Sequence, residues 1–93
     1  MPTESEEVAH LIGCQVVVDT STPYLYIGTL KAWKENVVIL ECVDVHDVSG
    51  GSSGKDMYVL EARRYGVQQN RNEVTVRKQA IVSVSRLEDV INY

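Results

Sequence analysis

The clearest pattern of hydrophobic and polar positions lies between Tyr24 and His46. Up to Trp33 the side chains alternate between two faces, which is the period of a β-strand. After a tight turn at residues 34–36, a solid apolar run follows and then loosens into alternation, as in a strand that passes from a fully covered to a half-exposed position. Gly28, in the middle of the first strand, usually marks a bend or a close backbone approach. The pattern predicts a bent central hairpin in a small barrel.

A short N-terminal helix is predicted over residues 3–12. Thr3 and Glu6 form a capping box, in which each side chain accepts a hydrogen bond from the other residue's backbone amide. Three apolar residues then share one face of the helix: Val8, Leu11 and Ile12. Gly13 stands where the helix is expected to stop. Because so short a helix is not stable alone, we expect it to dock on an open end of the barrel.

Four further segments have the apolar content and alternation of strands. They are residues 15–19, 57–65, 73–77 and 80–87. The Gly/Ser-rich segment 47–56 is predicted to be a flexible loop, because its residues cannot pack. The chain therefore predicts an all-β (mainly β) fold, in which five or six bent antiparallel strands form a small barrel. A length of 93 residues predicts a single domain over residues 1–93.

The charge is distributed unevenly along the chain. Residues 1–62 carry ten acidic and three basic side chains, a net charge of −7, whereas residues 63–86 carry six basic and one acidic side chain, a net charge of +5. Glu88 and Asp89 complete the total of −4. A local basic surface can bind phosphate because distant charges are screened over about 8 to 10 Å. The alternative is that these basic residues pair with acids on a neighbouring strand or subunit.

The longest apolar stretches have only a few residues and the N-terminus is acidic, so neither a signal peptide nor a membrane-spanning segment is predicted. We therefore expect a cytoplasmic location. Cys14 and Cys42 lack the spacing of a metal site or a redox pair. Both are predicted to be buried small hydrophobic side chains.

Enzyme chemistry is not supported by the motifs. Asp44, His46 and Asp47 form the one cluster that could hold a metal or act as a base, and Asp44 and His46 point to the same face of a strand. Three ligands from one edge do not complete a site without a partner, so we interpret the cluster as a polar strand end. No nucleophile elbow, phosphate loop or paired-cysteine motif is present. We therefore predict no catalysis, no metal, no cofactor and no small-molecule substrate.

The order of these parts resembles the Sm and LSm family. The parts are a capped helix, Gly13-x-x-Val16-x-Val18, Gly28-x-Leu30, an apolar third strand, a variable loop and a last short hairpin. The family's second motif, Ile-Arg-Gly followed by an apolar residue, is matched in part by Val76-Arg77-Lys78 and Ile81. The resemblance implies a five-stranded SH3-like barrel whose edge strands pair with those of neighbouring copies. Such rings bind single-stranded RNA, often uridine-rich, at the inner rim.

Both of the family's motifs are matched incompletely. The first motif places an Asp six residues and an Asn ten residues after the strand glycine, where this chain has Lys34 and Val38. With a turn two residues shorter, Asn36 takes the place of the Asn and Ala32 that of the Asp. In the second motif the glycine is replaced by a lysine, so the resemblance carries over Arg77, together with Asn36 if the turn is short.

A substitute RNA site is predicted in the two turns that the family's fold brings together. Lys34, Asn36, Arg77 and Lys78 offer cationic and amide donors suited to phosphate groups and base edges. Trp33 is adjacent to them. It is either a stacking platform for a base or a residue of the core or of an interface between copies.

Self-association is predicted from two strand edges, at residues 57–60 and 81–85, which lack Pro and Lys. A repeated head-to-tail contact between copies closes into a ring if the rotation between neighbouring copies permits it. The leading hypothesis is a homo-oligomeric Sm-like ring that binds single-stranded RNA as an RNA chaperone or RNA-processing scaffold. The alternative is a structural homo-oligomer or protein-interaction adaptor without RNA binding, since the motif Asp and Gly are missing and the total charge is negative.

Overall fold

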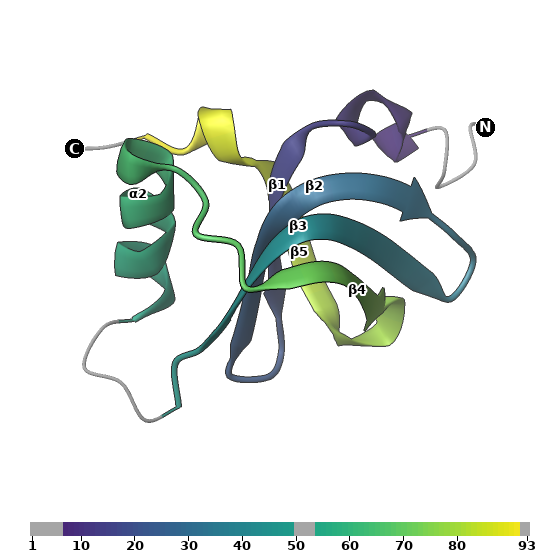
Figure 1. Ribbon diagram of the computed structural model, residues 1–93. Coiled ribbons are helices and arrows are strands. Elements are labelled where there is room, and N and C mark those ends of the chain that lie inside the picture. The colour runs from purple at the N-terminus through teal and green to yellow at the C-terminus, as the bar shows by residue number, and fades with distance from the viewer. Residues whose placement is uncertain (1–6, 50–53, 92–93) are drawn as a thin grey trace.

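The computed structural model describes residues 7–49 and 54–91, and the predicted capping box at Thr3 and Glu6 lies outside them (Figure 1). Within these ranges, five antiparallel strands form one sheet in the order β4-β3-β2-β1-β5. The strands are β1 (Gln15–Thr20), β2 (Tyr24–Trp33), β3 (Val37–Asp47), β4 (Arg71–Arg77) and β5 (Ile81–Arg86). The predicted mainly β fold of five bent antiparallel strands is confirmed.

In the described ranges, four helical segments with defined bounds flank or connect the strands. They are η1 (Ala9–Leu11), α2 (Lys55–Tyr65), η2 (Lys78–Ala80) and η3 (Leu87–Asp89). Because η2 joins the two edge strands in only three residues, β4 and β5 lie close together at that end and the sheet curls into a barrel (Figure 1). Across the described ranges, no helix combines the length and the apolar character needed to cross a membrane.

The central hairpin forms as predicted. β2 and β3 pair from Tyr24 opposite Asp47 to Trp33 opposite Val38, and the register shifts between Ile27 and Thr29, at Gly28, and again between Leu30 and Ala32. A Cβ atom at Gly28 would lie 3.0 Å from the Glu41 carbonyl oxygen and 3.1 Å from the Val43 Cα atom. The predicted close backbone approach at Gly28 is therefore confirmed, and it lets the hairpin bend tightly enough to build the barrel.

Apolar side chains form a core on each face of the sheet, because successive residues of a strand point to opposite sides. In β1, Val16 and Val18 belong to the first core cluster and Val17 belongs to the second. The first core cluster is Leu11, Val16, Val18, Leu30, Val38, Leu40, Val43 and Val76. The second core cluster is Val17, Leu25, Ile27, Ala62 and Leu87. Burying each Val, Leu or Ile contributes roughly 1.5–3 kcal/mol, so both clusters stabilise the fold.

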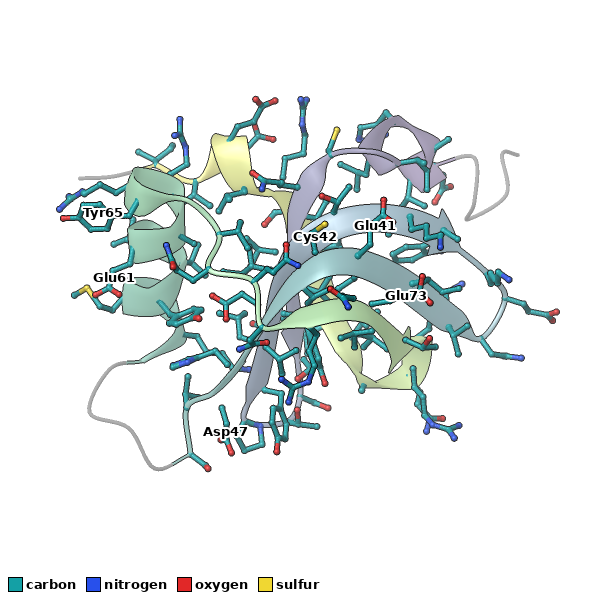
Figure 2. All side chains as sticks on the ribbon, in the orientation of Figure 1. Glu41, Cys42, Asp47, Glu61, Tyr65 and Glu73 are labelled. Carbon is teal, nitrogen blue, oxygen red and sulfur yellow. The ribbon has the colours of Figure 1, made fainter. Side chains whose placement is uncertain are left out.

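The segment predicted as a strand at residues 57–65 is instead the helix α2. Its Leu, Glu, Ala and Arg residues are good helix formers, and Arg63 and Arg64 in the last turn complement the helix dipole. Gly66, with φ of 95°, ends the helix, and its amide donates to the Ala62 carbonyl over 2.9 Å. Glu61 and Tyr65 point away from the sheet (Figure 2).

This helix also corrects the predicted edges of the sheet. Residues 57–60 are helical and form no edge, whereas the predicted edge at residues 81–85 lies in β5, which is an edge strand. The other edge is β4. The strand prediction was wrong because Tyr58 and Val59 have a high strand propensity. In the structure, both side chains are partly buried because helix α2 packs on the second core cluster.

The N-terminal segment docks on the barrel as predicted, with one exception. Leu11 is buried in the first core cluster and Val8 packs against it, but the Ile12 side chain is 44% exposed. Gly13, with φ of 87°, ends the turn, and its amide donates to the Leu30 carbonyl over 2.8 Å. Of the predicted loop at 47–56, residues 50–53 lie outside the described ranges, and α2 already begins at Lys55.

The two cysteines differ in burial. Cys14 is half-buried against the first core cluster. Cys42 is exposed and has φ of 53°, so its predicted burial is wrong. Cys42 has no paired residue on either neighbouring strand, β2 or β4. At this irregularity its side chain departs from the alternation of buried and exposed side chains along β3.

Candidate functional site

The β2–β3 turn and η2 meet at one end of the barrel. β3 and β4 pair with Val37 opposite Arg77, so the residues just beyond this pair are neighbours. The Lys78 backbone amide donates to the Asn36 carbonyl over 3.0 Å, and the Lys78 ammonium donates to the Lys34 carbonyl over 2.9 Å. The structure thus brings the predicted site residues into one group. We call it the turn cluster, and its members are Trp33, Lys34, Asn36, Arg77 and Lys78.

Trp33 is half-buried at the inner side of the turn cluster and packs against the first core cluster. This contact agrees with the packing interpretation of its role. The Lys78 ammonium nitrogen lies 5.1 Å from the centroid of the indole ring, close enough for a cation–π interaction. The indole N–H of Trp33 is buried and has no hydrogen-bond partner among the described residues. On the face of the ring that Lys78 covers, a base could stack only if Lys78 moved.

The turn cluster carries three cationic side chains. Lys34 and Arg77 are exposed, and neither makes an ion pair within the part of the chain that the structure describes. Glu35 is the acidic neighbour in the same turn. Because amide and cationic donors face solvent together here, the cluster suits an anionic ligand with acceptor oxygens.

Other basic residues follow the alternative interpretation and pair with acids. The Lys31 ammonium lies 2.8 Å from the Glu73 carboxylate, and this contact raises the pKa of Lys31. Arg86 pairs with Glu88. In the last third of the chain, Arg86 is therefore ion-paired, whereas Arg77 of the turn cluster is exposed.

The Asp44/His46 cluster has a structural role. The Asp44 carboxylate is buried and accepts hydrogen bonds from the Tyr58 hydroxyl and, over 3.2 Å, from the Asn70 side-chain amide. His46 stacks on the Tyr58 ring with a centroid separation of 3.7 Å, so Asp44 and His46 do share a face. Burial and the Asp44 contacts raise the pKa of the Tyr58 hydroxyl.

These contacts fasten α2 to β3. Asn70 adds to them: its side-chain oxygen accepts a 3.0 Å hydrogen bond from the Val45 amide, and its side-chain nitrogen donates a 3.1 Å hydrogen bond to the Val45 carbonyl. Sequence reasoning missed Tyr58 and Asn70 because they lie 14 and 26 residues from Asp44. Over residues 7–49 and 54–91, the His, Cys, Asp and Glu side chains form no group of three suited to a metal ion.

No protein-family model matches the chain, and no curated protein matches its sequence. Among solved structures, the chain is similar to the Sm protein of Pyrococcus abyssii in complex with a uridine heptamer, with a TM-score of 0.61 and 11% identity. That similarity covers 91% of this chain and 99% of the other.

The chain is also similar to a chain of the NatC complex bound to CoA, and to one of the NatC complex bound to Gag peptide and CoA. Both comparisons have a TM-score of 0.55 and 17% identity over 83% of this chain, and they cover 79% and 86% of the other chains, respectively. These similarities show that the chain has the Sm-like fold, which confirms the SH3-like barrel expected from its motifs.

Proposed function

We propose that this chain binds single-stranded RNA through the turn cluster, in a ring of identical copies. The observation that carries the proposal is the pair of hydrogen bonds by which Lys78 joins the β2–β3 turn to η2. These bonds place Lys34, Arg77 and Lys78 on one surface. Such a surface can contact successive phosphates of a strand, and the exposed Asn36 amide can read a base edge.

Edge-to-edge association would multiply this weak site. β4 and β5 are the edges of the described sheet, and Val82 on β5 is 66% exposed. In a closed ring each copy would add one turn cluster around the same axis, so a single RNA strand would engage several clusters together. The similarity in fold to an Sm protein in complex with a uridine heptamer supports uridine-rich RNA as the ligand. We propose a cytoplasmic binding role without catalysis, as an RNA chaperone or RNA-processing scaffold.

The test is binding of a short oligo-uridine by fluorescence anisotropy over a series of salt concentrations. An Arg77→Ala/Lys78→Ala variant should bind at least tenfold more weakly at low salt. Its slope of log affinity against log salt should fall by about 1.4, since each phosphate contact contributes about 0.7 on single strands. Light scattering on the same samples measures the number of copies.

The matched control removes the same charge elsewhere. Arg63 and Arg64 are exposed on α2, and Figure 1 shows this helix at the opposite end of the molecule from the β2–β3 turn. An Arg63→Ala/Arg64→Ala variant should bind oligo-uridine like the wild type. If both double variants bind as the wild type does, or both weaken equally, the turn cluster is not the RNA site.

A second candidate is a protein-interaction subunit that has the barrel but does not bind RNA. Two observations favour it: a chain of the NatC complex has a similar fold, and this chain has a net charge of −4. This candidate predicts that the wild-type chain does not bind oligo-uridine even at low salt. The anisotropy measurement therefore separates the two candidates directly.

A further inference from the structure

A hollow lies on the α2 side of the barrel. Its volume is about 610 Å³. Val17 and Leu25 lie on the sheet beneath it, Val59 lines it from α2, and Val90 and Ile91 line it from the segment that follows η3. We call this hollow the α2 trough.

The α2 trough lies over the second core cluster. Val17 and Leu25 are buried members of that cluster, and α2 covers it by contacting β2 and η3. Beyond the helix, Ser85 on β5 is exposed and the Ile91 side chain is 74% exposed. An apolar side chain that entered the trough would therefore continue an existing core and would cover Ile91.

The rim of the α2 trough is acidic. The Lys55 ammonium is already committed, because it donates to the Asp19 carboxylate over 2.6 Å and to the Thr20 and Thr22 carbonyls over 2.9 Å each. Asp56 and Asp89 also line the trough, are exposed, and form no ion pair within the described ranges. Among the residues that the structure describes, Lys55 is the only basic one in its lining. The trough therefore offers an apolar floor with uncompensated negative charge beside it.

We propose that the α2 trough is a docking surface for an amphipathic helix of a partner protein, with Lys or Arg residues flanking its apolar stripe. The apolar stripe would pack on Val59, Val90 and Ile91, above the buried Val17 and Leu25, and the basic residues would meet Asp56 and Asp89. The proposal does not rest on RNA binding. Carboxylates at this rim repel phosphate, and α2 lies at the other end of the barrel from the β2–β3 turn (Figure 1).

The exposure of the lining favours a protein segment over a small molecule. Asp56, Ser85, Asp89 and Ile91 are all exposed, so a small ligand would stay largely in contact with water. Small-molecule sites usually bury 70–90% or more of the ligand surface, whereas a helix lying along the trough could cover these side chains.

The experiment titrates the full-length, isotope-labelled chain with three synthetic peptides of about 16 residues, a length at which helix begins to form in water. The first has a leucine stripe flanked by lysines, the second has the same composition in scrambled order, and the third has glutamate in place of lysine. The first peptide should bind at least tenfold more tightly than the other two. Its amide shift changes should centre on Val17, Ser85 and Ile91.

Two exposed isoleucines provide a matched pair of variants. Ile91→Lys places a cation inside the trough, whereas Ile12→Lys makes the same change near η1, outside it. Ile91→Lys should weaken binding of the first peptide at least fivefold and leave oligo-uridine affinity unchanged, while Ile12→Lys should have little effect on peptide binding. An Asp56→Asn/Asp89→Asn variant should also weaken binding and reduce its salt dependence.

Three outcomes would overturn the proposal: equal affinity for the scrambled or glutamate peptide, shift changes centred on another surface, or equal weakening by the two isoleucine variants. Loss of RNA binding with peptide docking intact would refute the RNA proposal alone. The amide spectra of the variants report directly whether each remains folded.

Discussion

The side-chain ammonium of Lys78 donates a 2.9 Å hydrogen bond to the backbone carbonyl of Lys34, a residue 44 positions earlier in the chain. Together with the bond from the Lys78 amide to Asn36, this contact turns two separate turns into one cationic surface. The link lies at the end of the barrel where β4 passes through η2 into β5. It therefore couples the shape of the proposed RNA site to the closure of the barrel.

Replacing Lys78 by methionine keeps most of the aliphatic side chain and removes the ammonium. The free energy of unfolding should fall by about 0.5–1.5 kcal/mol, because a hydrogen bond to a backbone carbonyl is lost. Urea denaturation measures this change. Oligo-uridine affinity should fall in the same variant and should recover in large part in Lys78→Arg, which restores the cation. Equal RNA affinity in Lys78→Met and the wild type would exclude Lys78 from the RNA site.

Val82→Lys tests association through β5. Val82 is 66% exposed on an edge strand, and a lysine on a sheet edge opposes pairing with another strand. Light scattering should show several copies for the wild type and a single copy for the variant, with an unchanged free energy of unfolding per chain at low concentration. Tyr65→Lys, on the 71% exposed Tyr65 of α2, is the control and should leave assembly intact. Assembly that survives Val82→Lys would place the contact away from β5.

Gly28→Ala should destabilise the barrel because the new Cβ atom has no room. It would lie 3.0 Å from a backbone oxygen of Glu41 and 3.1 Å from the backbone of Val43, neither of which can move without disturbing β3. We expect a loss of about 1–3 kcal/mol in the free energy of unfolding. The control is Gly54→Ala, where a Cβ atom would meet nothing within 4 Å. A similar loss in both variants would mean that crowding at Gly28 is not the cause.

Tyr58→Phe should cost about 1–3 kcal/mol of unfolding free energy at neutral pH, because the buried Asp44 carboxylate loses a donor. The pKa of Tyr58 is raised in the folded chain above its ordinary value of 10.0. Protonated Tyr58 thus stabilises the fold below pH 10, and this contribution is lost as pH rises through the folded-state pKa. The stability difference between the wild type and Tyr58→Phe should therefore shrink above pH 10. Urea denaturation at a series of pH values checks this, and a difference that grew with pH would contradict the hydrogen bond to Asp44.

The central hairpin could be predicted because its signals are local. The turn at residues 34–36 separates two strands of clear period, and Gly28 marks the bend in the first of them. The turn cluster could also be predicted from the resemblance to the Sm and LSm family. In that fold the third and fourth strands pair, and here the pairing of β3 with β4 brings Asn36 and Lys78 together.

The helix α2 was missed although local signals for it were present. Arg63 and Arg64 followed by Gly66 are a sequence signal for the end of a helix. The prediction gave more weight to the strand propensity of Tyr58 and Val59. The buried role of Asp44 had no local signal at all. It depends on Tyr58 and Asn70, which reach Asp44 only when α2 folds back over β3.

Taken alone, the amino-acid sequence determined the five strands of the sheet, the central turn and the glycine that bends the hairpin, but not α2, because each of these features depends on the conformational preferences and side-chain period of a few consecutive residues. Tertiary structure alone decided where the charges act. It joined the cations of the β2–β3 turn and η2 through Lys78, paired Lys55 with Asp19, and left Asp56 and Asp89 along the α2 trough. Such contacts join residues far apart in the chain, and their geometry is set by packing, which no local pattern records.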